Sequence, residues 1–282
     1  MRILCGDIGG TNTRLAHWDG SLGHIRTFLG SAHDHVRGPL RAWLAESGVR
    51  PDVACLAVAG PVANNRCVAT NLPWVVDGAE LASEFGFPFR VVNDFAAAAK
   101  GTLLLDESDV VQLGGTQRMF GEPVAVLGAG TGLGQAILVG HAVVPGEGGH
   151  AEFGPSTERE ARLSAWLIGQ YGRASWEHVL SGRGLVNLFK FTCFEASSLV
   201  PEWVNAVDAP ARVVESEPHV VAWFAELYGS EAGNMALRVM ARGGVYLAGG
   251  IAPRMVPALQ EGGFRRRFEA KGSVGAAIRD VP

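Results

Sequence analysis

Two glycine-rich segments of this chain have the composition of phosphate-binding turns. The first is GDIGGT at residues 6–11, and the second is GAGTGLG at residues 128–134. In a turn between antiparallel strands, backbone N–H groups converge, glycine lets a phosphate approach closely, and a threonine hydroxyl adds a donor. Neither segment has the Walker sequence or the dinucleotide fingerprint. An ordinary tight hairpin is the alternative for either turn alone, but the pair, with Asp7 inside the first, favours phosphate binding.

Acidic side chains beside expected strand ends are candidates for metal binding and proton transfer. Asp7 lies at the edge of the first turn, where one carboxylate is sufficient for Mg²⁺, because that ion keeps several of its waters. Asn93 and Asp94 follow an expected strand and precede an Ala-rich helix, and open α/β sheets bind ligands at the carboxyl ends of strands. Asp94 is therefore placed to accept a proton from a substrate hydroxyl that attacks phosphorus. The alternatives are a turn-capping role for Asp7 and a helix N-cap at Asn93-Asp94, and the dipeptide alone favours the cap.

The loop PGEGGH places Glu147 and His150 three residues apart among glycines. Such a pair is able to bind zinc, but no cysteine cluster lies nearby to complete the site. The pair is also able to hydrogen-bond vicinal sugar hydroxyls, since a carboxylate accepts and an imidazole donates or accepts. Glu177, in SWEHVLSGRG, is a third candidate, with a helix-surface carboxylate as the alternative. Asp, Asn, Glu and His together supply the donors and acceptors that a polyol site requires.

The elements that must position these residues alternate between strands and helices, which predicts an α/β fold. In the first half, strands are expected at residues 2–5, 13–18, 53–58 and 89–92, and helices at 36–47, 80–85 and 95–100. In the second half, strands are expected at 123–127, 135–139 and 245–248, and helices at 157–168, with a Thr157–Glu160 capping box, and at 220–240, where Gly229 and Gly233 can interrupt the helix. Both halves begin with a strand, a glycine turn and a strand, so we expect an internal duplication. The predicted domains are a smaller lobe over 1–104 and a larger lobe over 105–282.

Composition and charge exclude several classes of protein. Of 282 residues, 48% are hydrophobic and only 18% are charged, which excludes a disordered chain. The net charge is −4 and the dense basic cluster 265–267 is expected to be a solvated helix face, so no nucleic-acid partner is expected. The apolar runs are too short for a membrane span, and the first residues do not resemble a signal peptide. The four cysteines form no C-x-x-C pair, so a reduced, cytoplasmic location is expected.

Six segments resemble, in order, motifs of the bacterial glucokinase family, within the hexokinase and actin-like ATPase superfamily. They are GDIGGTNTRLA, VNDFAAAAKG, VLGAGTGLGQA, PGEGGHAEFGP, EHVLSGRGLVNL and GGVYLAGGIAPR, which span roughly residues 3–254. The resemblance implies a two-lobed actin-like ATPase fold, related to ribonuclease H, with duplicated α/β domains that close over the sugar. It also implies transfer of a phosphoryl group from ATP to the 6-hydroxyl of glucose, the first step of glycolysis.

The resemblance also assigns roles to individual residues of this chain. Asp94 matches the family's base, which faces the 6-hydroxyl, and the remaining sugar ligands match Asn93, Glu147, His150 and Glu177. The residues that match nucleotide-binding positions are Asp7, Gly9, Gly10, Thr11 and Asn12 in the first phosphate hairpin, Gly130, Thr131 and Gly132 in the second, and Gly249 and Gly250 beside the adenosine. ATP is therefore the expected co-substrate, and Mg²⁺ at Asp7 the expected metal.

The chain departs from the family pattern at its end. Family members continue past the equivalent of residues 280–282 with a strand and a helix that packs on the N-terminal lobe, so we expect this fold to lack both and to expose apolar surface there. The related repressor, open-reading-frame and kinase family fits less well, because its cysteine-rich zinc motif is missing. The alternatives left open are a kinase of the same fold acting on another hexose or amino sugar, and a non-catalytic descendant that binds sugar or nucleotide. The phosphate donor (ATP, ADP or polyphosphate) and a homodimer are also open.

Overall fold

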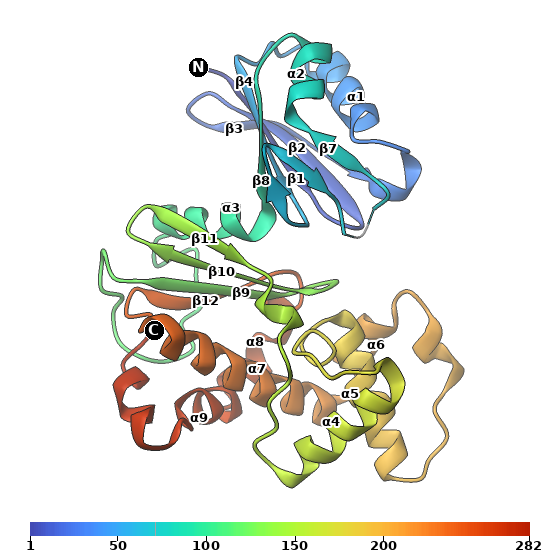
Figure 1. The fold of residues 1–282 in the computed structure, drawn as a ribbon, viewed down its shortest axis with the longest axis vertical. Coiled ribbons are helices and arrows are strands. Elements are labelled where there is room, and N and C mark those ends of the chain that lie inside the picture. The colour runs from blue at the N-terminus through green and yellow to red at the C-terminus, as the bar shows by residue number, and fades with distance from the viewer. Residues whose placement is uncertain (71) are drawn as a thin grey trace. The chain divides into compact units, whose positions relative to one another are not determined.

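The chain divides into two compact units, Met1–Ala97 and Ala98–Pro282, in a computed structural model that describes residues 1–70 and 72–282 (Figure 1). Each unit contains a sheet with helices packed against it, as the predicted α/β class requires. The expected domain boundary after residue 104 falls at the end of a short 3-10 helix, Thr102–Leu104, in the second unit. That boundary stays a prediction.

The first unit is built on a five-stranded sheet of order β3-β2-β1-β4-β8. The strands are β1 (Ile3–Ile8), β2 (Asn12–Trp18), β3 (Leu22–Leu29), β4 (Val53–Val58) and β8 (Phe89–Asn93). β1, β4 and β8 run parallel, with Ile8 opposite Val58 and Val58 opposite Asn93. Because the carboxyl ends of these three strands are aligned, the segments that follow them lie on one edge of the sheet, where α/β proteins bind ligands.

One face of this sheet carries the core of the first unit. Buried side chains of the strands, such as Leu56, pack against Leu40 and Trp43 of α1 and Leu81 of α2. The remaining elements are α1 (Arg37–Ser47), α2 (Gly78–Phe85), α3 (Asp94–Gly101) and a small sheet of β5 (Val62–Ala63), β6 (Arg66–Val68) and β7 (Val75–Asp77). Helices α1 and α2 and the small sheet position the long strands by burying their apolar side chains, whereas α3 crosses from the first unit into the second.

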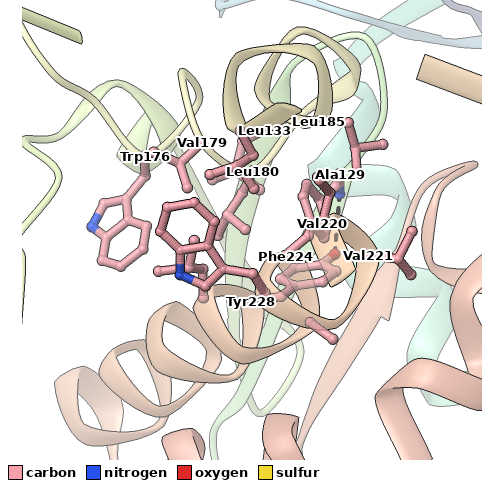
Figure 2. Close-up of a cluster of buried hydrophobic side chains, with 14 of the residues drawn as sticks. Ala129, Leu133, Trp176, Val179, Leu180, Leu185, Val220, Val221, Phe224 and Tyr228 are labelled. Atoms are coloured by element: carbon pink, nitrogen blue, oxygen red, sulfur yellow. Dashed lines mark hydrogen bonds between the residues drawn. The ribbon is translucent and has the colours of Figure 1, made fainter. Parts of the chain in front are cut away.

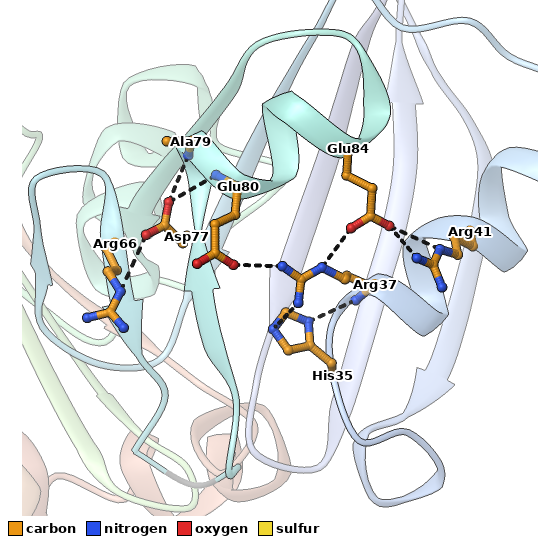
Figure 3. A network of polar contacts seen from close by, with 8 residues as sticks. All are labelled: His35, Arg37, Arg41, Arg66, Asp77, Ala79, Glu80 and Glu84. Carbon is orange, nitrogen blue, oxygen red and sulfur yellow. Dashed lines mark hydrogen bonds and ion pairs between the residues drawn. The ribbon is translucent and has the colours of Figure 1, made fainter.

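Ion pairs join the two helices of this face. Figure 3 shows the Arg37 guanidinium between two carboxylates of α2, at 2.7 Å from both Glu80 and Glu84. Arg41 donates to Glu84 at 2.6 Å. Planar guanidinium groups in such paired geometry fix the orientation of the two helices more than they add free energy, because solvent still reaches every member of the network.

The opposite face of the sheet is half-exposed and lines an open cavity of about 300 Å³. Cys5 and Cys55 lie side by side on neighbouring parallel strands there. Burial raises the pKa of both thiols, and for Cys5 the neighbouring Cys55 adds to the effect. Both thiols are therefore protonated and weakly nucleophilic at neutral pH.

The second unit repeats part of this arrangement. Its sheet has the order β11-β10-β9-β12, with β9 (Val124–Ala129), β10 (Leu133–Val139), β11 (Ala142–Gly146) and β12 (Gly244–Ala248). β9 is antiparallel to β10 and parallel to β12, as β1 is to β2 and β4. The predicted duplication is thus visible in the topology. Within the residues that the structure describes, the second sheet has no counterpart of β8.

Six α-helices lie wholly within the second unit in the described residues. They are α4 (Glu158–Tyr171), α5 (Gly182–Glu195), α6 (Ala209–Ser216), α7 (Pro218–Val239), α8 (Val256–Gln260) and α9 (Gly263–Glu269). The central helix is α7, whose buried face belongs to the largest hydrophobic cluster of the chain. None of the helices in the described residues combines the length and apolarity needed to cross a membrane.

Helix α7 is continuous, so the expected interruption at Gly229 and Gly233 is wrong. These glycines permit close helix packing. A Cβ atom at Gly229 would lie 2.1 Å from the backbone oxygen of Phe264, and one at Gly233 would lie 2.3 Å from that of Phe268. Both oxygens belong to α9, which reaches the α7 backbone only because the two side chains are absent.

Replacing Gly229 by Ala should lower the free energy of unfolding by about 1–3 kcal/mol, although alanine is the better helix former. The added methyl group meets backbone atoms of α9, which cannot rotate away. Gly169→Ala in α4 is the matched control, since nothing lies within 4 Å of its Cβ position, and it should stabilise the protein by about 0.5–1 kcal/mol. Urea denaturation measures both, and equal stability of the two variants would contradict this packing role.

The basic cluster 265–267 is only partly the solvated face that we expected. Arg266 is largely exposed, but the Arg267 side chain is only 14% exposed and pairs with the buried Glu160 at 2.7 Å. Arg265 donates to the backbone oxygen of Val281 at 2.9 Å. The capping box is also modified. The Thr157 hydroxyl accepts from the Glu160 N–H, as expected, whereas the Glu160 carboxylate accepts from the Ser156 N–H and from Arg267. Tertiary contact with α9 redirected both side chains.

Candidate active site

The first glycine turn joins β1 to β2 in the first unit. It is tighter than expected, because β1 continues through residues 6–8 and β2 begins at Asn12. The Gly9 N–H donates to the Asn12 oxygen at 3.0 Å and closes the turn, and the Thr11 oxygen accepts from Gly30 N–H at 2.8 Å. Gly10 and Thr11 stand at the tip, with Thr11 exposed. The tip therefore presents backbone groups and one hydroxyl to an incoming anion.

Asp7 belongs to β1 rather than to the turn. Its carboxylate forms an ion pair with Arg14, directly opposite on β2, at 3.1 Å. Both side chains are more than half exposed, at 54% and 58%. Within the described residues, no group of three His, Cys, Asp or Glu side chains is arranged to hold a metal. The single exposed carboxylate of Asp7 suits an ion such as Mg²⁺, which takes few protein ligands and keeps its waters, better than a metal that is bound entirely by protein side chains.

Asn93 ends β8 and Asp94 begins α3, at the same sheet edge as the first turn. The Asn93 oxygen Oδ1 accepts from Ala96 N–H at 2.9 Å, so the capping interpretation is correct for Asn93. Its Nδ2 donates to the backbone oxygen of Gly60 at 3.0 Å. Asp94 is half-buried, and its Oδ1 accepts from Phe95 N–H at 3.0 Å. Both side chains therefore satisfy backbone N–H groups in the first turn of α3.

The second glycine turn joins β9 to β10 in the second unit. Gly130 N–H donates to the Gly132 oxygen at 2.9 Å, with Thr131 exposed between them. Gly249 follows β12 and packs against the end of β9, since a Cβ atom there would lie 2.5 Å from the Ala129 oxygen. At Gly250, nothing lies within 4 Å of the Cβ position. The structure thus places the second turn and the Gly249-Gly250 pair next to each other.

A buried tyrosine of α7 holds the strand that leads into this turn. Figure 2 shows Tyr228 reaching the backbone of Ala129 within the hydrophobic cluster. Its hydroxyl accepts from Ala129 N–H at 3.1 Å and donates to the Leu127 oxygen at 3.3 Å. Burial raises the Tyr228 pKa far above its ordinary value, so the hydroxyl keeps its proton and both bonds.

Glu177 connects the second turn to the loop that carries Glu147 and His150. Its Oε2 accepts from Leu133 N–H at 3.1 Å, just after the turn, and its own N–H donates to the Gly149 oxygen at 2.8 Å. The Glu177 side chain is only 17% exposed. It therefore does not occupy the helix-surface position that was the alternative interpretation.

Glu147 and His150 project from the loop that follows β11. Both side chains are more than half exposed, and 4.0 Å separates the Glu147 Oε2 and His150 Nε2 atoms. Gly149 between them is buried, and a Cβ atom there would lie 2.0 Å from the Leu133 oxygen. The described residues give this pair no third His, Cys, Asp or Glu ligand of the kind that a zinc site needs.

The neighbour of Glu177, His178, is a structural residue. Its ring stacks on Tyr171 with a centroid distance of 4.4 Å. Burial lowers the His178 pKa, and the charge of Arg183 lowers it further. The imidazole is therefore neutral at pH 7 and accepts from Ser175 N–H at its Nδ1 atom.

The structure brings the predicted residues together within each unit. The first unit holds the first turn, Asn93 and Asp94 on one sheet edge, and the second unit holds the second turn, Gly249-Gly250, Glu177 and the loop 147–150 in contact. Sequence reasoning missed three buried residues of the second unit that support the second turn and the loop 147–150. They are Tyr228, Gln135 and Glu231. The signal was weak: Glu231 stands between the two glycines of α7 in an otherwise buried, apolar stretch.

Two α/β units, each with a glycine hairpin beside a parallel strand, and with acidic and amide side chains at the strand ends, define a phosphotransferase of the actin-like ATPase fold. A sequence model of the glucokinase family matches residues 4–282. The chain is 38% identical over 291 residues to the glucokinase of Yersinia enterocolitica, covering 99% of this chain and 90% of that protein. It belongs to the glucokinase family.

Solved structures agree with this assignment. The crystal structure of a glucokinase from an Antarctic psychrotroph is 33% identical, with a TM-score of 0.84, and the match covers 100% of this chain and 92% of that one. A glucokinase from Streptomyces griseus, solved in complex with glucose and AMPPNP, has a TM-score of 0.67 over 95% of this chain and 90% of that one. Its identity of 20% supports the fold alone.

Proposed function

We propose that this chain transfers the terminal phosphoryl group of ATP to the 6-hydroxyl of glucose, with Asp94 as the base. The family match over nearly the whole chain supports the reaction. The observation that supports the residue assignment is the position of Asp94, just after β8 and on the same carboxyl edge of the sheet as the first glycine turn. Phosphoryl transfer needs little covalent chemistry from the protein, so positioning and charge neutralisation supply most of the rate.

In the first unit, the proposed roles concern the hydroxyl and the phosphates. The Asp94 carboxylate accepts the proton of the attacking hydroxyl, and the Asn93 side chain orients the sugar while its bonds hold the start of α3. The tip of the turn, at Gly9, Gly10, Thr11 and Asn12, binds phosphate oxygens. Asp7 would hold Mg²⁺ through its waters, and this ion neutralises charge on the phosphates when bound.

In the second unit, the proposed roles concern the sugar and the rest of the nucleotide. Glu147, His150 and Glu177 hydrogen-bond the sugar hydroxyls, because a polyol needs acceptors as well as donors. The turn at Gly130, Thr131 and Gly132 binds phosphate, and Gly249 and Gly250 let the adenosine approach the backbone. A homodimer and a cytoplasmic location belong to this proposal, and light scattering after size-exclusion chromatography tests the dimer.

A panel of sugars and donors tests the reaction. Product formation is measured for glucose, mannose, fructose and an amino sugar, each with ATP, ADP and polyphosphate. We expect glucose with ATP to give the highest kcat/KM. A higher value for another sugar would establish the alternative kinase. Calorimetric binding of glucose without any product would instead establish a non-catalytic sugar-binding protein.

Asp7→Asn should raise the free Mg²⁺ concentration needed for half-maximal activity by about 10-fold or more, the usual effect of losing a group that holds a metal through its outer shell. Activity at saturating ATP and glucose is measured over a Mg²⁺ titration. Asp34→Asn, at an exposed loop position of the same unit, is the control and should leave the titration unchanged. An unaltered Mg²⁺ dependence in Asp7→Asn would remove this residue from the metal site.

A further inference from the structure

The carboxylate of Glu231 is fully buried inside the second unit. Its exposed fraction is 0%, and it accepts hydrogen bonds from Gln135 Nε2 at 2.9 Å, Asn234 Nδ2 at 2.9 Å and Arg238 Nη1 at 2.8 Å. Burying a charge is costly even when the charge is paired, and well-packed apolar residues often serve stability as well. This buried ion pair is therefore weak evidence for a purely stabilising role of Glu231.

Gln135 links this carboxylate to the loop that carries Glu147 and His150. Gln135 lies on β10 with 3% of its surface exposed, and its backbone pairs with Gly146 at the end of β11. Its side-chain oxygen Oε1 lies 2.0 Å from the position that a Cβ atom of Gly148 would occupy. One end of the Gln135 amide thus contacts Glu231, and the other end packs against the backbone of the loop.

The carboxylate decides which way this amide faces. An ionised carboxylate only accepts hydrogen bonds, whereas an amide has one end that donates and one that accepts. Glu231 therefore holds the Gln135 NH₂ group toward α7 and leaves the amide oxygen toward Gly148. An apolar residue at position 231 would not impose this orientation.

We infer that Gln135 and Glu231 are positioning residues that hold the loop 146–150 in the conformation that binds the sugar. This inference rests on the proposed function, in which Glu147 and His150 bind sugar hydroxyls. The loop has its own anchor at Gly149, whose oxygen accepts from Glu177 N–H at 2.8 Å. The Gln135 amide oxygen adds a packing contact at Gly148, and in this inference the bond and the contact together set the spacing of the Glu147 and His150 side chains.

Two variants test this pair. Glu231→Met and Gln135→Glu should each raise the KM for glucose by about 10-fold, which corresponds to a loop displacement well below 1 Å. Methionine removes the acceptor for the Gln135 amide, and glutamate at position 135 places a second carboxylate against Glu231. The KM for ATP should change less than about twofold, because the phosphate turns keep their own contacts.

Arg238→Met is the control for a purely structural role. Arg238 contacts Glu231 from the solvent side, with 45% of its side chain exposed, and it leaves the bond to Gln135 in place. This variant should lower the Tm without changing the KM for glucose. An equal rise of that KM in Arg238→Met, or no rise in the two single variants, would overturn the inference.

Hydrogen exchange gives a readout that does not depend on sugar. Backbone amides of residues 146–150 should exchange faster in Glu231→Met and in Gln135→Glu, but at the parent rate in Arg238→Met. Unchanged exchange in the single variants would contradict the positioning role even if the protein had no activity on glucose. Calorimetry of glucose binding to the parent protein distinguishes failure of this inference from failure of the proposed function. If the parent protein does not bind glucose, only the proposed function is contradicted.

Discussion

Replacement of Asp94 by Asn should lower the kcat for glucose phosphorylation by about 10²–10⁴-fold, the range that a general base contributes. The amide has almost the same shape as the carboxylate and keeps an oxygen that accepts from Phe95 N–H, so α3 should begin as before. It cannot accept the proton of the attacking hydroxyl. A coupled assay of glucose 6-phosphate formation measures the rate, and thermal unfolding shows whether the variant is folded.

The control for this variant is Asp208→Asn. Asp208 is an exposed aspartate before α6 whose side chain makes no capping hydrogen bond, and we expect its removal to leave kcat within about twofold. Calorimetric binding of glucose to Asp94→Asn should persist, because Asn93, Glu147, His150 and Glu177 are unchanged. Turnover near the parent rate in a folded Asp94→Asn variant would show that Asp94 is not the base.

Gly149→Ala should lower the free energy of unfolding by about 1–3 kcal/mol. The new Cβ atom would lie 2.0 Å from the backbone oxygen of Leu133, so the loop itself must move away from β10. That movement displaces Glu147 and His150 and breaks the bond from Glu177 N–H to the Gly149 oxygen. The KM for glucose should therefore rise by about 100-fold, as for a misplacement of about 1 Å.

Gly154→Ala provides the comparison a few residues along the same segment. Nothing lies within 4 Å of the Cβ position at Gly154, so this variant should match the parent in both stability and KM. Urea denaturation and steady-state kinetics on both variants separate close packing at Gly149 from a general effect of losing a glycine. If Gly149→Ala bound glucose normally, the loop would not be the sugar-binding element that we propose.

Much of the fold was predictable because local patterns report local structure. Short continuous apolar runs identified β4 at Val53–Val58 and the start of the second sheet, and the apolar spacing of 36–47 identified α1 almost to the residue. The glycine turns were placed correctly but drawn too long, since the strands run further into them. Helix α7 was misjudged, because two glycines look the same in sequence whether they break a helix or let a neighbour approach.

The candidate site also has a part that local sequence predicts and a part that only the folded chain shows. Residue types and spacing were enough to select the turns at 9–12 and 130–132, the strand-end pair Asn93-Asp94 and the loop 147–150, since each of these is a short segment with its chemistry in consecutive residues. Their roles in catalysis stay predictions.

The contacts that hold these segments could be read only from the folded chain. Glu177 reaches Leu133 across 44 positions, Gln135 reaches Glu231 across 96, and Arg267 reaches Glu160 across 107. No local period encodes such pairs, because they arise when strands and helices that are distant in sequence pack together and bury polar groups that must then find partners.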